Sequence, residues 1–269
     1  MGTRPLILVT NDDGIASLGL SAAARSVLDL GEVWVVAPRV QQSGVGRSFP
    51  AGPTHSQVGA LDIDGTPVHS VSMDASPAKA VRHGLLRFLP RLPALAIAGI
   101  NYGENLGGCI TVSGTIGAAI EAASFGIPTL AASLETDPKY HFSTSDEVDF
   151  VAAASFVRRL AVLVLSRGMP DRTDILKLDV PCDATPDTPW RVTRVSRQQY
   201  FVSPVSVDEG GKRHIQSYVK EVDLAALEPD SDVHAVAVDR VVSVTPLTVD
   251  LTAYAGLAPL QHMLFKQVP

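Results

Sequence analysis

The chain has 269 residues, a length typical of one large domain or of one domain with an appendage. Hydrophobic residues make up 46% of the sequence and charged residues 19%, which excludes an intrinsically disordered chain. The net charge of −6 argues against a general nucleic-acid-binding protein, because no excess of basic residues is available to neutralise phosphates.

Short apolar runs alternate with longer amphipathic runs through the first two thirds of the chain. They predict strands at residues 6–10, 33–37, 95–100, 129–133 and 175–180, and helices at residues 18–30, 76–89, 113–125 and 146–166. Strands that are apolar throughout and alternate with helices form a parallel sheet covered on both faces. Because such crossovers are right-handed, we predict an α/β fold with a Rossmann-like, doubly wound, mostly parallel sheet.

The sequence changes character after about residue 185. Prolines and a pair of glycines separate short β-type runs at residues 190–195, 215–219 and 239–244. We therefore expect a Rossmann-like catalytic core at residues 1–185 and a β-rich C-terminal extension at residues 186–269 that completes the same domain. A projecting hairpin or tail of this extension is expected to pair with another subunit.

Signals for export or membrane insertion are weak. The apolar run at residues 6–9 is too short for a signal peptide, and no later run reaches 18 residues. Two cysteines, Cys109 and Cys182, are too few for a disulfide scaffold. We expect a cytoplasmic protein without a membrane partner.

Two adjacent carboxylates, Asp12 and Asp13, follow the first predicted strand, between Asn11 and Gly14. They repel each other and attract a cation. An acidic turn that caps the next helix explains the same residues. Their spacing alone leaves both interpretations open.

The three asparagines of the chain favour a binding site. Asn11 follows the first strand, and Asn101 and Asn105 follow the strand at 95–100. A third loop, after the strand at 33–37, supplies the hydroxyl of Ser43. Carboxyl ends of parallel strands are where open α/β sheets bind ligands. Carboxylate, hydroxyl and amide oxygens suit Mg²⁺ or Mn²⁺ and do not suit zinc.

Small residues open the helix predicted at 113–125. The sequence Ser113, Gly114, Thr115 places free backbone N–H groups and a helix N-terminus at one point, which favours a phosphate. An ordinary serine N-cap with small residues for close packing is the alternative.

The sequence resembles the survival protein SurE family in the order and spacing of several motifs. The motifs are residues 11–14 (NDDG), 37–38 (AP), 42–44 (QSG), 99–101 (GIN), 105–107 (NLG), 113–115 (SGT), 126–128 (GIP) and 244–247 (VTPL). The resemblance implies a metal-dependent phosphatase that hydrolyses nucleoside 5′- and 3′-monophosphates, and also short polyphosphate. It further implies a Rossmann-like core, a swapped C-terminal hairpin or helix, and a homodimer or homotetramer.

The resemblance also assigns the site residues. It implies one divalent cation per subunit, Mg²⁺ or Mn²⁺, with the ligands Asp12, Asp13, Ser43 and Asn101. We expect catalytic roles for Asp12 and Asp13, and expect phosphate binding by Asn11, Asn105, Ser113, Gly114 and Thr115.

The sequence leaves one question of mechanism and one question of function open. Either a water molecule attacks phosphorus, or one aspartate attacks and forms an aspartyl phosphate. A non-catalytic nucleotide-sensing module that uses the same phosphate pocket is the alternative function.

Aromatic and histidine residues give weaker signals. Tyr102, Tyr140 and Phe201 are candidates for stacking on a base, although plain packing or subunit contact explains each equally well. None of the seven histidines has the paired spacing of metal ligands, so we expect surface or capping positions for them.

Overall fold

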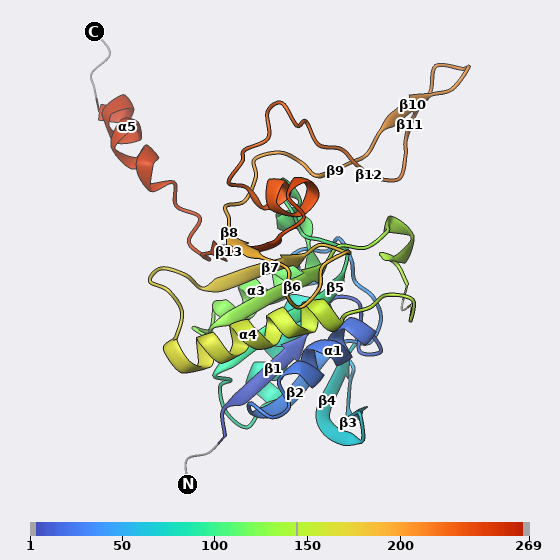
Figure 1. Cartoon of the computed structure of the whole chain (residues 1–269), viewed down its shortest axis with the longest axis vertical. Coiled ribbons are helices and arrows are strands. Elements are labelled where there is room, and N and C mark those ends of the chain that lie inside the picture. Colours follow the sequence, from blue (N-terminus) through green and yellow to red (C-terminus); the bar gives the residue numbers. More distant parts are fainter. Residues whose placement is uncertain (1–3, 144, 266–269) are drawn as a thin grey trace.

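The computed structural model describes residues 4–143 and 145–265, which are built around a nine-stranded sheet with the order β3-β4-β2-β1-β5-β6-β7-β13-β8 (Figure 1). Its strands are β1 (Leu6–Thr10), β2 (Glu32–Pro38), β3 (Ser56–Ile63), β4 (Thr66–Met73), β5 (Leu95–Tyr102), β6 (Thr129–Leu134), β7 (Ile175–Val180), β8 (Trp190–Val192) and β13 (Val242–Leu247). Neighbours pair in parallel except β3 with β4 and β7 with β13. The predicted mostly parallel sheet is confirmed.

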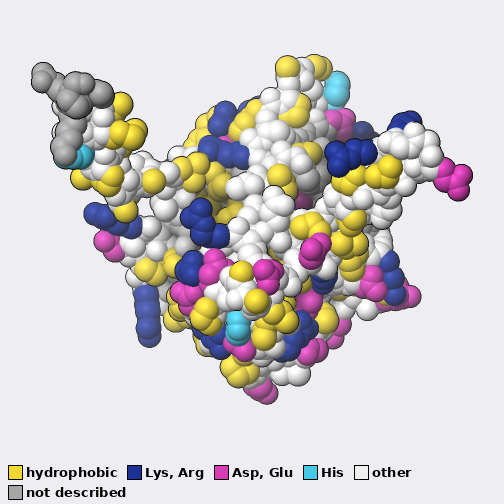
Figure 2. Space-filling model, turned by 90° about the horizontal axis from the view of Figure 1, so that it is seen from above, with side chains coloured by type: hydrophobic (Ala, Val, Ile, Leu, Met, Phe, Trp, Pro, Cys, Tyr) yellow, Lys and Arg dark blue, Asp and Glu magenta, His cyan; other side chains and the backbone are white. Residues whose placement is uncertain are grey.

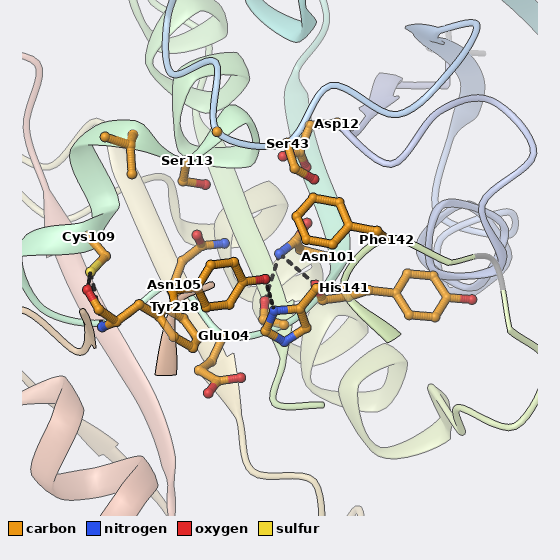
Figure 3. A pocket seen from close by; sticks show the side chains of 15 residues that line it. Asp12, Ser43, Asn101, Glu104, Asn105, Cys109, Ser113, His141, Phe142 and Tyr218 are labelled. Atoms are coloured by element: carbon orange, nitrogen blue, oxygen red, sulfur yellow. Dashed lines mark hydrogen bonds between the residues drawn. The ribbon is translucent and has the colours of Figure 1, made fainter. Parts of the chain in front are cut away.

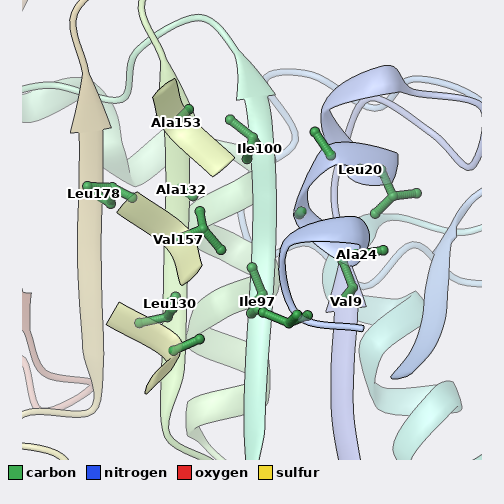
Figure 4. Close-up of a cluster of buried hydrophobic side chains, with 14 of the residues drawn as sticks. Val9, Leu20, Ala24, Ile97, Ile100, Leu130, Ala132, Ala153, Val157 and Leu178 are labelled. Atoms are coloured by element: carbon green, nitrogen blue, oxygen red, sulfur yellow. The ribbon is translucent and has the colours of Figure 1, made fainter. Parts of the chain in front are cut away.

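Helices cover both faces of the sheet. On one face, α1 (Leu18–Ser26) and α4 (Val151–Arg167) pack on the apolar cluster shown in Figure 4, which includes Val9, Ile97 and Leu178. On the other face, α2 (Pro77–His83) and α3 (Gly114–Ala123) pack on a second cluster. Because both faces are covered, every residue of β1 is buried, as its apolar sequence predicts.

Helix ends follow local capping chemistry. The side chains of Ser17, Ser76 and Ser113 accept hydrogen bonds from the first turns of α1, α2 and α3. The helix predicted from residue 146 begins only at Val151, whose N–H donates to the Asp149 carboxylate at 2.8 Å; the N-cap residue itself, Phe150, makes no side-chain cap. The helix predicted at 18–30 ends at Ser26, and the helix predicted at 76–89 becomes α2 followed by the short π-helix η1 (Gly84–Phe88).

The antiparallel hairpin of β3 and β4 was not predicted. Its turn is formed by Asp64 and Gly65, which both have positive φ angles, 51° and 80°. Asp-Gly is the favoured sequence for such two-residue turns, so the signal was present in the chain.

The last third of the described chain contributes β8 and β13 to the central sheet. Its other strands form two small antiparallel pairs, β9 (Phe201–Val202) with β12 (Val219–Lys220) and β10 (Val205–Val207) with β11 (Arg213–Ile215). The strand predicted at 215–219 is therefore wrong. The chain leaves β11 at Gln216, whose N–H donates to the Pro204 carbonyl, before β12 begins.

Two segments project from the body in Figure 1: the β10–β11 hairpin and the C-terminal helix α5 (Tyr254–Phe265). Figure 2 shows hydrophobic side chains on the α5 arm, where Leu257, Met263 and Phe265 are more than half exposed. Three further short helices are η2 (Gly108–Val112), η3 (Pro138–Tyr140) and η4 (His234–Val238). Within residues 4–143 and 145–265, no helix has the length and apolarity needed to span a bilayer.

Candidate active site

A cavity of about 330 Å³ opens at the carboxyl ends of β1, β2 and β5 (Figure 3). The residues that line it are Asp12, Ser43, Gly44, Asn101, Tyr102, Gly103, Glu104, Asn105, Cys109, Val112, Ser113, His141, Phe142, Phe201 and Tyr218. The volume falls within the range of small-molecule sites. Loops that are far apart in sequence therefore meet where ligands bind in open α/β sheets.

Asp12 and Asp13 are both buried at the end of β1. Burial raises the pKa of Asp12 to about 6, although the Thr115 hydroxyl donates a hydrogen bond to its carboxylate. Burial also raises the pKa of Asp13 well above its usual value, and the charge of Asp12 raises it further. Among the described residues, no Lys, Arg or His forms an ion pair with either carboxylate. Burial thus disfavours ionisation of the pair, and no cationic side chain within residues 4–143 and 145–265 offsets it.

The Gln41 side chain links Asp13 to Ser43 and to the backbone of His141. Its Nε2 group lies 3.2 Å from Asp13 Oδ1, 3.1 Å from Ser43 Oγ and 2.5 Å from the His141 carbonyl oxygen. The backbone N–H of Tyr102 donates to the second Asp13 oxygen at 3.2 Å. The loop after β1, the loop after β2 and the last residue of β5 therefore meet at Asp13, a contact that the sequence pattern did not reveal.

Asn101 presents its oxygen rather than its nitrogen to the cavity. Its Nδ2 group donates to the carbonyl oxygens of Tyr102 and Gly103, at 3.3 and 2.7 Å, which leaves Oδ1 free of those contacts. Asp12 and Ser43 lie together in Figure 3, with Asn101 on the same side of the cavity.

These groups fit a hard divalent cation. Two carboxylates, a hydroxyl and an amide oxygen are the ligands that Mg²⁺ and Mn²⁺ prefer. Burial raises the pKa of Asp12, and burial followed by the charge of Asp12 raises that of Asp13; a dication bound here would stabilise the ionised forms of both.

A second acidic cluster, Glu135, Cys182 and Asp183, is a weaker candidate for a metal. Arg240 already pairs with it, at 2.7 Å from Glu135 and 2.5 Å from Asp183. A side-chain cation therefore balances this cluster.

The N-terminus of α3 faces Asp12. A Cβ atom on Gly114 would lie 2.6 Å from Asp12 Oδ2, and the N–H groups of Gly114 and Thr115 lower the pKa of Asp12. Gly114 and Thr115 contact Asp12 and are not among the lining residues, whereas Ser113 lines the cavity and caps the helix. Only glycine permits this close approach of helix and carboxylate.

Asn105 and Asn11, the other two residues expected to bind phosphate, occupy different positions relative to the cavity. Asn105 lines the cavity, and its Nδ2 group donates to Ser133 Oγ at 2.8 Å. Asn11 is buried outside the lining set, where its Nδ2 group donates to the Gly14 carbonyl and its Oδ1 atom has no hydrogen-bond partner in the part of the chain that the structure describes.

A buried ion cluster, formed by Lys177, Asp179 and Asp232, holds the Asn105 loop. The Lys177 ammonium donates to the Asn105 carbonyl at 2.9 Å, and Asp179 accepts the Asn105 N–H at 2.7 Å. Asp232, from the extension, lies 3.0 Å from Lys177 and accepts the Gly107 N–H at 3.2 Å. Sequence reasoning missed this cluster, although charged residues alternate within the apolar strand β7.

One wall of the cavity is aromatic. Tyr102 and Phe201, two of the three candidates for base stacking, line it, whereas Tyr140 is not among the lining residues. His141 lies in this wall and is only 7% exposed, so it is not a surface residue. It is the C-cap residue of η3, as the expectation of a capping position allows. Phe142 was not recognised in the sequence, because nothing local distinguishes it from a packing residue.

Comparisons with known proteins agree on one family. A family model described as Survival protein SurE matches residues 7–202. The 5′-nucleotidase SurE of Thermococcus gammatolerans is 42% identical over 97% of this chain and 96% of its own length. The 5′-nucleotidase SurE of Methanothrix thermoacetophila is 43% identical over 96% of this chain and 98% of its own length. The crystal structure of the SurE protein from Aquifex aeolicus matches with a TM-score of 0.79 at 31% identity, over 97% of this chain and all of that chain.

Proposed function

The chain belongs to the SurE family, and we propose that it is a metal-dependent phosphatase that hydrolyses nucleoside 5′-monophosphates to nucleoside and phosphate. Relatives about 40% identical over nearly their whole length carry the name 5′-nucleotidase SurE. The observation that carries the proposal is the pair of buried aspartates, which has no cationic partner among the described residues, beside a cavity lined by Ser43, Asn101 and Ser113.

In this proposal, Asp12, Asp13, Ser43 and Asn101 hold one Mg²⁺ or Mn²⁺. When bound, such an ion supplies Lewis-acid stabilisation of the phosphoryl oxygens. Gln41 fixes the orientation of the Asp13 carboxylate and the Ser43 hydroxyl through its Nε2 group.

Of the five residues expected to bind phosphate, we propose that Asn105 and Ser113 hold it from the cavity wall, with the helix N-terminus at Gly114 and Thr115 behind Asp12, whereas Asn11 lies outside the lining. The positive end of the α3 dipole lies beside Asp12, so an anion in this part of the cavity is favoured. Ser113 and Asn105 line the cavity directly, and Gly114 lets the helix approach closely.

Asp12 and Asp13 orient the attacking water in the route that we favour. Their engagement with a cation weakens either carboxylate as a nucleophile, which disfavours an aspartyl phosphate. Rapid acid quench of a single turnover with ³²P-labelled AMP separates the two routes, because only the aspartate route leaves labelled phosphate on the protein, as an acyl phosphate that hydroxylamine cleaves. Such labelled protein would contradict the water route.

The finer assignments follow from the same premise. We propose that the enzyme also accepts 3′-monophosphates and short polyphosphate, and that it forms a homodimer or homotetramer in the cytoplasm. The exposed apolar side chains of α5 support the oligomer, because such a helix is otherwise left in water.

Phosphate release from AMP tests the proposal. Activity is expected with Mg²⁺ or Mn²⁺, and EDTA is expected to abolish it. Asp12→Asn is expected to lower kcat by about 100-fold or more, whereas the exposed control Asp187→Asn retains activity. AMP binding without turnover in the wild type would support a nucleotide sensor instead.

A further inference from the structure

The loop between β2 and β3, here called the Ser43 loop, is held to the body of the protein on both sides of its serine. Before Ser43, the backbone N–H of Gln42 donates to the Asp12 carbonyl at 2.7 Å. After it, the backbone N–H of Gly46 donates to the Val112 carbonyl at 2.9 Å. Because the segment between these two hydrogen bonds is short, their positions determine where the Ser43 hydroxyl lies at the cavity (Figure 3).

The tip of the Ser43 loop makes few contacts of its own. Ser43 and Gly44 are exposed, and the Ser43 hydroxyl lies 3.1 Å from Gln41 Nε2. A Cβ atom on Gly44 would have no neighbour within 4 Å among the described residues. Packing at the tip therefore does not hold the serine in place, and the segments on either side of it must do so.

Arg47 ties the segment after the serine to helix α3. Its guanidinium lies 2.9 Å from the Glu121 carboxylate and donates to Ser124 Oγ at 2.9 Å. The Glu121 side chain has no exposed surface, so water screens this ion pair only weakly. The helix also approaches the loop closely, because a Cβ atom on Gly117 would lie 2.3 Å from the Gly46 carbonyl oxygen. The ion pair and this contact fix the loop on the helix directly after the serine.

Glu121 has a second arginine partner, which comes from helix α2. Arg82 Nε donates to the Glu121 carboxylate at 2.6 Å, and its guanidinium lies 4.0 Å from the centre of the Phe49 ring. The two arginines have similar exposure, 37% for Arg47 and 42% for Arg82. They differ in that only Arg47 belongs to the Ser43 loop, so their separate removal distinguishes control of the loop from general packing of the helices.

We propose that Arg47 is a positioning residue, whose ion pair with Glu121 fixes the Ser43 hydroxyl where it can bind the divalent cation. Arg47 acts through the loop and touches neither the ion nor the substrate. Groups that orient a metal ligand in this way change metal affinity by about 10–100-fold when they are removed. This inference rests on the proposed function, because the cation is the one that the proposal assigns to Ser43.

Mn²⁺ binding to the full chain, measured by calorimetry without substrate, tests this role. Arg47→Met is expected to raise the Kd for Mn²⁺ by roughly tenfold, and Arg47→Lys, which keeps the charge, is expected to recover most of the affinity. Arg82→Met is the matched control, because it removes the other partner of the same carboxylate, and its Kd is expected to stay at the wild-type value. An unchanged Kd in Arg47→Met, or an equal rise in both methionine variants, would overturn the proposal.

The Ser43→Ala background shows whether the effect passes through the serine. Arg47→Met is expected to cause no further rise in the Kd for Mn²⁺ in this background, because the hydroxyl that Arg47 positions is missing. Additive losses in the double variant would mean that Arg47 acts on the site by another route, and would also overturn the proposal.

Amide hydrogen exchange provides a readout that needs no metal. The Gly46 N–H, which donates to the Val112 carbonyl, is expected to exchange roughly tenfold faster in Arg47→Met than in the wild type or in Arg82→Met. Unchanged exchange of Gly46 in Arg47→Met would overturn the role of Arg47 in fixing the loop. If the wild type binds no Mn²⁺, the proposed metal-dependent function fails, and the exchange of Gly46 still decides whether Arg47 positions the Ser43 loop.

Discussion

Lys177→Met tests the buried ion cluster beneath the Asn105 loop. The Lys177 ammonium pairs with Asp179 and Asp232, and all three side chains have no exposed surface. Burial alone would lower the pKa of Lys177, but the charges of Asp179 and Asp232 outweigh it and raise the pKa. The lysine is therefore charged in the folded protein, and methionine, which is similar in length, leaves two buried carboxylates that repel each other.

The expected loss is large on the scale of protein stability. Removing one partner of a buried ion pair costs about 3–5 kcal/mol, because the remaining charge has no compensation. A domain is stable by about 5–15 kcal/mol, so the variant loses a considerable part of its free energy of unfolding. At roughly 2–4 °C per kcal/mol, Tm is expected to fall by about 6–20 °C.

Denaturant unfolding followed by circular dichroism measures this loss. Arg158→Met is the control, because Arg158 forms an exposed ion pair with Asp29 and its removal is expected to leave stability nearly unchanged. Adding Asp179→Asn and Asp232→Asn to Lys177→Met is expected to recover stability, since carboxamides keep acceptor oxygens for the backbone N–H groups without the charge. Equal losses in the Lys177 and Arg158 variants would refute the reasoning.

Three further changes probe the site and its surroundings. Gly114→Ala is expected to lower kcat/KM by about 100-fold in a folded protein, because the new Cβ displaces Asp12; wild-type kcat/KM would contradict this contact. Gln41→Leu is expected to weaken Mn²⁺ binding by about 10–100-fold in calorimetry, whereas the adjacent Gln42→Leu is the control. Burial raises the pKa of Glu135, but its arginine and lysine partners outweigh burial and lower the pKa to about 2. The free energy of unfolding of the wild type is therefore expected to fall by about 3 kcal/mol between pH 4.5 and pH 2. Urea titrations at each pH measure this loss, which Glu135→Gln is expected to lack.

Local patterns in the sequence were sufficient for the family, the fold class and most elements of the core. The strand β1 is apolar because both faces of the sheet are covered, and Ser76 and Ser113 mark helix starts through capping. The motif loops follow β1, β2 and β5, so their meeting at one edge of the sheet is a consequence of parallel topology. The metal and phosphate roles of individual residues stay predictions.

Contacts between distant segments were decided only by the tertiary structure. Tyr218 meets His141 across 77 positions, and Lys177 in β7 meets Asp232 in the extension. Such pairs depend on the register of strands and the path of loops, which a local pattern of hydrophobic and polar residues does not encode. The order of residues along the chain thus determined which loops carry the chemistry, whereas packing between those loops decided which aromatic and charged side chains surround it.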